Sequence, residues 1–288
     1  MSKALFDAVE KYGKSKGMEE MIGPLGFTDL DPEGMLTMGF DQLGTMATIY
    51  NYPYYPEHME KLGDFEKDND YVEFKLMVPD KVPEKYTKIA EMIQKRYDLH
   101  IRKLTKKDVF EGGYGKKMFE LINTCFKDLY GYSELSERQI DQYIKMYFPL
   151  ADLSLITVVE DRSAGNKPVA VGITIPSLSK ALQKCRRGRL WPFGWWHVLR
   201  ALKAHKTEGV DLLLLGVLPE YRMKAPTPLC STTSSRAIRP TDQWARARLR
   251  WRPTRTCRAS GSISRPSSTR EDAATRSGYR FLPANGRK

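Results

Sequence analysis

The sequence predicts an α/β fold over residues 1–224, with mixed sheets flanked by helices, followed by a disordered tail over residues 225–288. Amphipathic helical patterns alternate with β-branched runs of strand length. The pair Gly165-Asn166 marks a turn that joins two such runs as a hairpin. Apolar periodicity ends at Ala225, and a chain without an apolar face has nothing to offset the entropy lost on ordering.

The first part of the chain carries helices separated by turn-rich segments and one long strand. The expected elements are a helix over 2–17, a short apolar segment over 21–27, turns over 29–34, an aromatic loop over 50–56, a helix over 56–62, a strand over 70–79 and a helix over 83–96. Gly17 can terminate the first helix, and Pro56 suits the first turn of the second. Polar and apolar residues alternate in DYVEFKLMVP, which is typical of a half-buried strand.

The second part has more strand character. The expected elements are a strand over 99–104, a helix over 105–130, a helix over 137–147, strands over 153–159 and 168–175, helices over 178–184 and 193–203, and a strand over 210–218. Ser136 is a suitable N-cap for the second of these helices. The run VDLLLLGVL is continuously apolar, which predicts a strand buried on both faces.

Composition indicates a soluble globular protein, with 41% hydrophobic and 28% charged residues. No run approaches the roughly 18 apolar residues of a membrane span. The N-terminus MSKALFDAVEKYGK lacks the apolar core of a secretory signal. We therefore expect a cytoplasmic protein without a membrane partner.

The net charge of +12 is concentrated at the C-terminal end. Residues 225–288 contain 14 Lys and Arg against 3 Asp and Glu, which leaves 33 basic and 32 acidic residues for residues 1–224. A nucleic-acid-binding face on the nearly neutral body is therefore not supported. The alternative function is a non-catalytic globular body whose basic tail binds nucleic acid or acidic surfaces.

The cysteines and histidines do not predict a metal site. Cys125, Cys185, Cys230 and Cys257 form no CxxC pair, and the four histidines are scattered. We expect ordinary thiols and no bound metal.

The segment from residue 212 carries the most specific pattern, LLLLGVLPEYR. It resembles the fourth strand and acyl-CoA loop of the GNAT-type N-acyltransferases, in which V-x-P-x-x-R is followed by a glycine-rich turn that opens a helix. In that arrangement, backbone N–H groups at the helix start approach the pyrophosphate. The resemblance implies that acetyl-CoA or another acyl-CoA is bound by Val217 and Leu218 along the acyl and pantetheine portion, and by Arg222, Met223 and Lys224 at the pyrophosphate.

The same resemblance implies transfer of an acyl group to an amine acceptor. A backbone N–H of the strand would polarise the thioester carbonyl, a base would take the amine proton, and a tyrosine would protonate the thiolate. No catalytic residue is assigned. Glu220 is a possible base, although an exposed loop glutamate is usually only solvated.

The motif is interrupted after Lys224 by Ala225-Pro226-Thr227-Pro228, on which no such helix can start. A one-base shift of the reading frame, with permitted codons, gives GANA for residues 224–228. It gives ETNENVQSQWQYLEAQQHKRGRCY for residues 251–275, which resembles the C-terminal segment of a Bacteroidales-type group of GNAT-like proteins. We therefore interpret the tail as out-of-frame sequence and expect impaired activity.

The same resemblance implies a protein built from two tandem GNAT-like lobes. By this resemblance, residues 1–96 are the later half of a first lobe and residues 97–224 the front part of a second lobe that ends at the acyl-CoA loop. Residues 225–288 are the Arg/Ser/Thr/Pro-rich tail.

Three further clusters have alternative interpretations. The aromatic run over 191–197 could wall an acceptor pocket or a lobe interface, or be a packed amphipathic helix that covers the sheet, which we favour. The basic run over 184–189 could attract CoA phosphates or be a solvated linker. The tyrosines over 50–55 could line a cleft or belong to a packed loop.

Overall fold

A computed structural model describes residues 1–26, 30–31, 33–45, 48–63, 65–77, 84–129, 132–149, 151–203, 209–224, 244–251 and 273–281. The chain divides into two compact units. The first comprises residues 1–75 and 248–288, and the second comprises residues 76–247.

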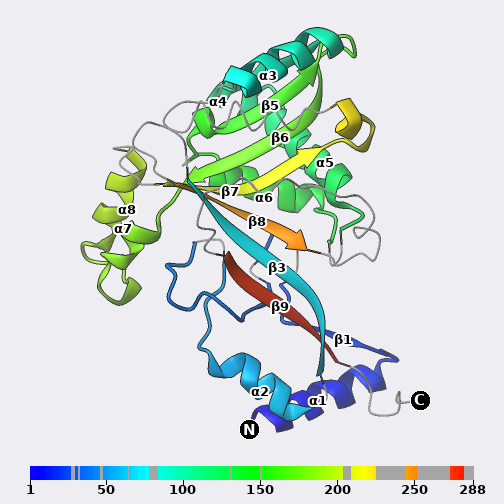
Figure 1. Cartoon of the computed structure of the whole chain (residues 1–288), viewed down its shortest axis with the longest axis vertical. Coiled ribbons are helices and arrows are strands. Elements are labelled where there is room, and N and C mark those ends of the chain that lie inside the picture. Colours follow the sequence, from blue (N-terminus) through cyan, green and yellow to red (C-terminus); the bar gives the residue numbers. More distant parts are fainter. Residues whose placement is uncertain are drawn as a thin grey trace. The chain divides into compact units, whose positions relative to one another are not determined.

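The first unit contains two helices and a small antiparallel sheet (Figure 1). Its elements are α1 (Ser2–Ser15), β1 (Met21–Gly23), β2 (Met35–Leu36), α2 (Tyr54–Leu62), β3 (Phe65–Met77) and β9 (Ala273–Phe281). Strand β9 pairs antiparallel with β1, β2 and β3. Met35 and Met59 form a small core, and Phe6, Leu62 and Phe65 pack against it.

The second unit contains the longer sheet and most of the helices. Its elements are α3 (Glu84–Tyr97), β4 (Leu99–Arg102), α4 (Lys106–Phe110), α5 (Tyr114–Phe126), α6 (Glu137–Tyr147), η1 (Leu153–Leu155), β5 (Ile156–Asp161), β6 (Lys167–Pro176), α7 (Ser179–Gln183), η2 (Arg186–Gly188), α8 (Gly194–Lys203), β7 (Gly209–Val217), η3 (Pro219–Lys224) and β8 (Trp244–Trp251). The sheet order is β8-β7-β6-β5-β4. All neighbours are antiparallel except β7 and β8, which are parallel.

The middle strands of this sheet are buried on both faces because helices cover them. Val158, Val159, Val169 and Val171 are completely inaccessible. Helix α5 packs on β6 and β7, and α3 packs on β4. This confirms the mixed α/β class with helices flanking the sheet.

The single helix expected over 105–130 is two helices, α4 and α5, separated by Gly112 and Gly113. Gly113 has φ of 72°, a left-handed conformation that glycine adopts without a Cβ penalty. A Cβ on Gly112 would lie 2.8 Å from the carbonyl oxygen of Asp108. The apolar face that predicts a helix, formed by Phe119, Leu121, Ile122 and Phe126, lies within α5 and gives no information on the residues before it.

Helix α6 agrees with the prediction at both ends. The Ser136 side chain accepts a hydrogen bond from the backbone of Gln139, whose side chain accepts one from the backbone N–H of Ser136. This reciprocal capping box satisfies two amide groups that would otherwise be unpaired at the helix start.

Two segments of the expected tail form strands, and the structure differs there from the sequence analysis. Residues 209–212 of β7 pair with residues 244–247 of β8, and β9 pairs within the first unit. Strand pairing joins backbone groups, so these segments need no apolar period of their own to extend a sheet. Residues 225–243, 252–272 and 282–288 lie outside the described residues.

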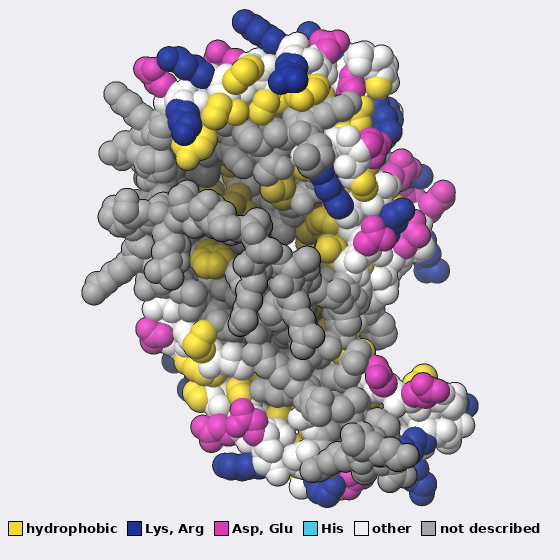
Figure 2. Space-filling model, turned by 45° about the vertical axis from the view of Figure 1, so that its right-hand side comes forward, with side chains coloured by type: hydrophobic (Ala, Val, Ile, Leu, Met, Phe, Trp, Pro, Cys, Tyr) yellow, Lys and Arg dark blue, Asp and Glu magenta, His cyan; other side chains and the backbone are white. Residues whose placement is uncertain are grey.

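On the face seen in Figure 2, basic and acidic side chains are interspersed over the described surface. No helix in the described ranges is long and apolar enough to cross a membrane.

Candidate functional site

Strand β7 contains a β-bulge at Leu213. Ile173 of β6 pairs with Leu214 and Thr174 pairs with Leu212, which leaves Leu213 as an extra residue without a partner in the β6 register. A bulge of this kind bends the strand and increases its twist. The parallel pairing with β8 runs from Gly209 to Leu212 and ends where the bulge begins. Beyond that point, the β8-facing edge of residues 213–217 has no strand partner among the described residues.

The bulged half of β7 also exposes apolar side chains. Leu213 and Leu215 are 36% and 48% exposed, so the prediction of a strand buried on both faces is wrong for these two residues. Gly216 faces the other side, where an added Cβ would touch Cys125 and Leu121 of α5 at 3.4 Å. Because side chains alternate along a strand, Leu215 points away from α5.

The chain turns sharply after β7 and is tied down by buried hydrogen bonds. Leu218 is buried, and its N–H donates to the carbonyl of Val169 at 3.0 Å. The Tyr221 hydroxyl donates to a carboxylate oxygen of Asp161 at 2.7 Å, and both residues are buried. Asp161 lies at the end of β5, so this bond fixes the turn to the β5–β6 hairpin.

The electrostatics of this pair favour a charged aspartate and a neutral tyrosine. Hydrogen bonds from Ser163, and next from Tyr221, lower the pKa of Asp161 against the opposing effect of burial. Burial, and then the Asp161 carboxylate, raise the pKa of Tyr221 to about 12. The pair is therefore an anchor at neutral pH, and Tyr221 holds its proton tightly.

Arg222 supports the turn through its side chain. Its guanidinium donates to the carbonyl of Val217 at 3.4 Å and to that of Cys125, near the end of α5, at 3.2 Å. Cations at a helix C-terminus complement its unsatisfied carbonyls. Val217 is half-buried beside it, so the structure brings together Val217, Leu218 and Arg222 of the predicted site.

The remaining predicted residues are seen only as backbone. Met223 and Lys224 lie in η3, and their side chains are outside the described residues, as are residues 225–228. Glu220, the possible base, is exposed and forms an ion pair with Lys167 at 3.3 Å. No catalytic residue is identified by this geometry.

A second titratable cluster, which the sequence analysis did not identify, lies where β4, β5 and the start of α5 meet. Glu160 is 1% exposed and accepts a hydrogen bond from the Tyr114 hydroxyl. Arg102 lies 3.8 Å from Glu160, 2.7 Å from Asp108 and over the Tyr114 ring. Burial, and then Glu160, raise the pKa of Tyr114 to about 12. Tyr114, Glu160, Arg102 and Asp108 pair with one another, although the buried Nε of Arg102 has no hydrogen-bond partner; the mutual pairing favours a structural role.

The aromatic run is not packed over the sheet, and the favoured interpretation was wrong for most of its rings. Trp191, Phe193 and Trp196 are 80%, 77% and 56% exposed. Helices α7 and α8 pack on each other and lie beyond the ends of β6 and β7 (Figure 1). The tyrosines over 50–55 are also exposed and form a chain of ring contacts along the loop.

No group of side chains in the described ranges could hold a metal ion. Cys125 and Cys185 are buried free thiols, and burial raises the pKa of Cys125 to about 11.

Comparisons with known proteins identify two curated relatives. The chain is 25% identical over 249 residues to the protein YghO of Escherichia coli, which covers 85% of this chain and 60% of YghO. It is 22% identical over 231 residues to a bacterial ceramide synthase of Caulobacter vibrioides, and the match covers 76% of this chain and 55% of the synthase. The chain thus spans between half and two thirds of the length of these relatives. No protein-family model matches it.

The solved structures that resemble the chain include GCN5-related N-acetyltransferases. One, from Sphaerobacter thermophilus, has a TM-score of 0.45 and 8% identity over 79% of this chain and 56% of its own. Another is the glucosamine N-acetyltransferase region of a fungal multi-domain β-N-acetylglucosaminidase. It has a TM-score of 0.49 and 10% identity, and the match covers 96% of this chain and 27% of the fungal chain. Such values say nothing about substrate. The chain has a mixed α/β fold, as the sequence predicts.

Proposed function

We propose that the second unit carries the acyl-CoA half of an N-acyltransferase site, which transfers an acyl group from acyl-CoA to a primary amine. One observation carries this proposal. The bulge at Leu213 coincides with the end of the parallel β7–β8 pairing, and the strand beyond it offers a backbone edge beside exposed leucines.

This arrangement suits a thioester with a long polar arm. The backbone groups of residues 213–217 can pair with the amides of the pantetheine arm, as a strand pairs with an added strand. An N–H next to the bulge can donate to the thioester carbonyl and stabilise the negative charge that develops there. The amine nitrogen attacks the carbonyl carbon, the C–S bond breaks, the amine loses a proton and the departing thiolate of CoA gains one.

We propose a long acyl chain as the transferred group. The exposed side chains of Leu213 and Leu215 would cover part of such a chain and gain from leaving water, whereas an acetyl group is too small to reach both. A ceramide is an amide of a fatty acid with a long-chain amino alcohol. The relative named as a ceramide synthase therefore supports a fatty acyl donor and a lipid-like amine acceptor.

We further propose that this chain is impaired as written. The residues after Lys224 include Pro226 and Pro228, at the place where the GNAT acyl-CoA loop that the segment resembles has a glycine-rich turn. Proline lacks the N–H that would face the pyrophosphate. Arg222 adds little to phosphate binding in its observed position, because its guanidinium is engaged by the carbonyls of Val217 and Cys125.

The test is an assay of CoA release with palmitoyl-CoA and sphinganine, and the amide product is detected by mass spectrometry. The frame-restored chain should form the amide, and the chain as written should be at least about tenfold slower. Leu215→Asp in the frame-restored chain should reduce turnover strongly, because a carboxylate would be buried under the acyl chain. Leu129→Asp is the matched control, since Leu129 is also exposed but lies just beyond α5.

Amide formation that survives Leu215→Asp unchanged would refute the assigned face. If neither chain forms an amide, and the chain as written binds a DNA oligonucleotide through residues 225–288 whereas the frame-restored chain does not, the alternative of a basic-tailed binding protein is supported instead.

A further inference from the structure

The segment between β6 and β7 combines exposed aromatic rings with an unbalanced positive charge. Residues 177–202 contain six Lys and Arg and no Asp or Glu. They also contain three of the five tryptophans of the chain, Trp191, Trp195 and Trp196. The rest of residues 1–224 has more acidic than basic residues, so the charge of the body is concentrated in this one segment.

The exposed rings are held out by ordered backbone. The Trp195 N–H donates to the carbonyl of Leu190 at 2.8 Å, and its indole N–H donates to the carbonyl of Pro192 at 2.7 Å. A Cβ on Gly194 would lie 2.2 Å from the carbonyl oxygen of Arg189, so only glycine fits there. The turn is therefore built to present Trp191 and Phe193 to the outside.

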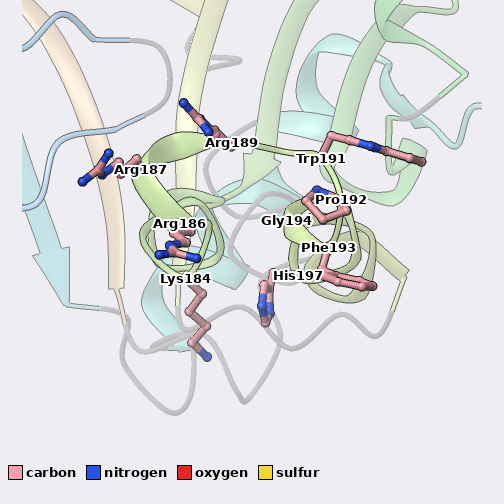
Figure 3. Close-up of a pocket in the computed structure, with 9 residues that line it drawn as sticks. All are labelled: Lys184, Arg186, Arg187, Arg189, Trp191, Pro192, Phe193, Gly194 and His197. Carbon is pink, nitrogen blue, oxygen red and sulfur yellow. The ribbon is translucent and has the colours of Figure 1, made fainter.

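The cations lie beside the rings around one hollow (Figure 3). The hollow of about 560 Å³ is lined by Arg186, Arg187 and Arg189 on one side and by Trp191 and Phe193 on the other. In this view, Arg187 extends to the left, and Trp191 and Phe193 extend to the right. Within the described part of the chain, none of these three arginines takes part in an ion pair.

We infer that residues 184–197 dock the protein on the surface of a bilayer that contains anionic phospholipids. Trp and Phe favour the boundary between headgroups and acyl chains, and flexible basic side chains reach the headgroup phosphates beside them. The four Lys and Arg side chains of residues 184–197, without a single acid, match a negative lipid surface. The sequence analysis expected no membrane partner because no segment is long enough to span, but docking at the interface needs no span.

Duplex nucleic acid is the less favoured occupant. Two aromatic rings of the segment, those of Trp191 and Phe193, are more than three quarters exposed. Insertion into a lipid interface uses such rings together with the arginines, whereas binding to duplex phosphates uses the arginines alone. The inference does not depend on the proposed acyltransferase function, because vesicle binding is measured without substrate.

The experiment is co-flotation of the full chain with vesicles of phosphatidylcholine, with and without about a third phosphatidylglycerol, at about 0.1 M salt. Binding should require phosphatidylglycerol. The triple variant Arg186→Gln, Arg187→Gln, Arg189→Gln should bind roughly 100-fold more weakly, at roughly fivefold per cation near an anionic surface. The double variant Trp191→Ala, Phe193→Ala should lose about tenfold or more.

The matched control removes three arginines from β8, as Arg246→Gln, Arg248→Gln, Arg250→Gln, and should retain binding. An equal loss in this control would overturn the inference, since the tail would then be the binding element. Retained binding in both segment variants would overturn it as well. So would retention on a DNA oligonucleotide without any binding to vesicles.

A further measurement uses the unaltered chain and therefore does not depend on whether the variants fold. Phospholipids brominated on the acyl chains should quench its tryptophan fluorescence. Absence of quenching under conditions where the chain floats with vesicles would contradict insertion of Trp191.

Discussion

Removal of the Tyr221 hydroxyl tests whether the turn after β7 is anchored as described. In Tyr221→Phe the ring stays and the hydrogen bond from its hydroxyl to Asp161 is lost. That bond is 2.7 Å long, joins two buried residues and ends on a carboxylate. Hydrogen bonds to charged groups are worth about 1.5–3 kcal/mol. Because Ser163 and the N–H of Ala164 still donate to Asp161, we expect the lower end, about 1.5 kcal/mol.

The assay is urea unfolding at neutral pH, followed by circular dichroism. The control is Tyr86→Phe, since Tyr86 is more than half exposed in α3 and its loss should cost less than about 0.5 kcal/mol. The pKa of Asp161 is lowered by folding, so its stabilising effect is present above the ordinary value of 3.8 and is lost as pH falls. The stability difference between wild type and Tyr221→Phe should therefore shrink in acid.

Two results would refute this reasoning. One is a Tyr221→Phe variant as stable as Tyr86→Phe. The other is a difference that persists undiminished well below the pH at which Asp161 becomes protonated.

The remaining predictions concern helix ends and alkaline pH. Ser136→Ala should destabilise the protein by about 1 kcal/mol in urea unfolding, because the capping box of α6 is lost; an unchanged midpoint would contradict the cap. Gly113→Ala should cost about 1 kcal/mol, because alanine is strained at φ of 72°, and Gly113→Asn should recover part of that loss in the same assay. Folding raises the pKa values of Tyr114 and Tyr221 to about 12, so stability should be full below the ordinary value of 10 and fall as pH rises to 12. A free energy of unfolding that does not change from pH 10 to 12 would argue against burial of the Tyr114 and Tyr221 hydroxyls.

Helix starts and turns could be predicted from the sequence where a single residue type determines the local backbone conformation. The N-cap at Ser136 and the hairpin at Gly165-Asn166 are such cases, since a side-chain acceptor and a left-handed turn residue act on their own neighbours. Gly112 and Gly113 carried an equally local signal for a break, but the prediction followed the apolar face within α5 and extended the helix back across them.

The candidate site was readable only in part. The run of four leucines predicts a strand, yet which of them are exposed depends on the bulge at Leu213. The bulge is set by pairing with β6 and has no residue pattern of its own. Likewise, Tyr221 stands in the motif, but its partner Asp161 lies 60 positions earlier in the chain and meets it only through the sheet.

The aromatic run failed as a prediction for a different reason. Amphipathic spacing indicates a face that is covered but does not say by what. The sheet does not cover the aromatic rings of residues 191–196. These rings and the neighbouring arginines of residues 186–189 are therefore available to an external surface.

The most direct test of the proposed site is calorimetric titration of palmitoyl-CoA into the frame-restored chain and into the chain as written. The account predicts binding to the frame-restored chain that Leu215→Asp weakens at least about tenfold, and weaker binding to the chain as written. No binding to the frame-restored chain, or binding that neither Leu215→Asp nor the change after Lys224 affects, would contradict it.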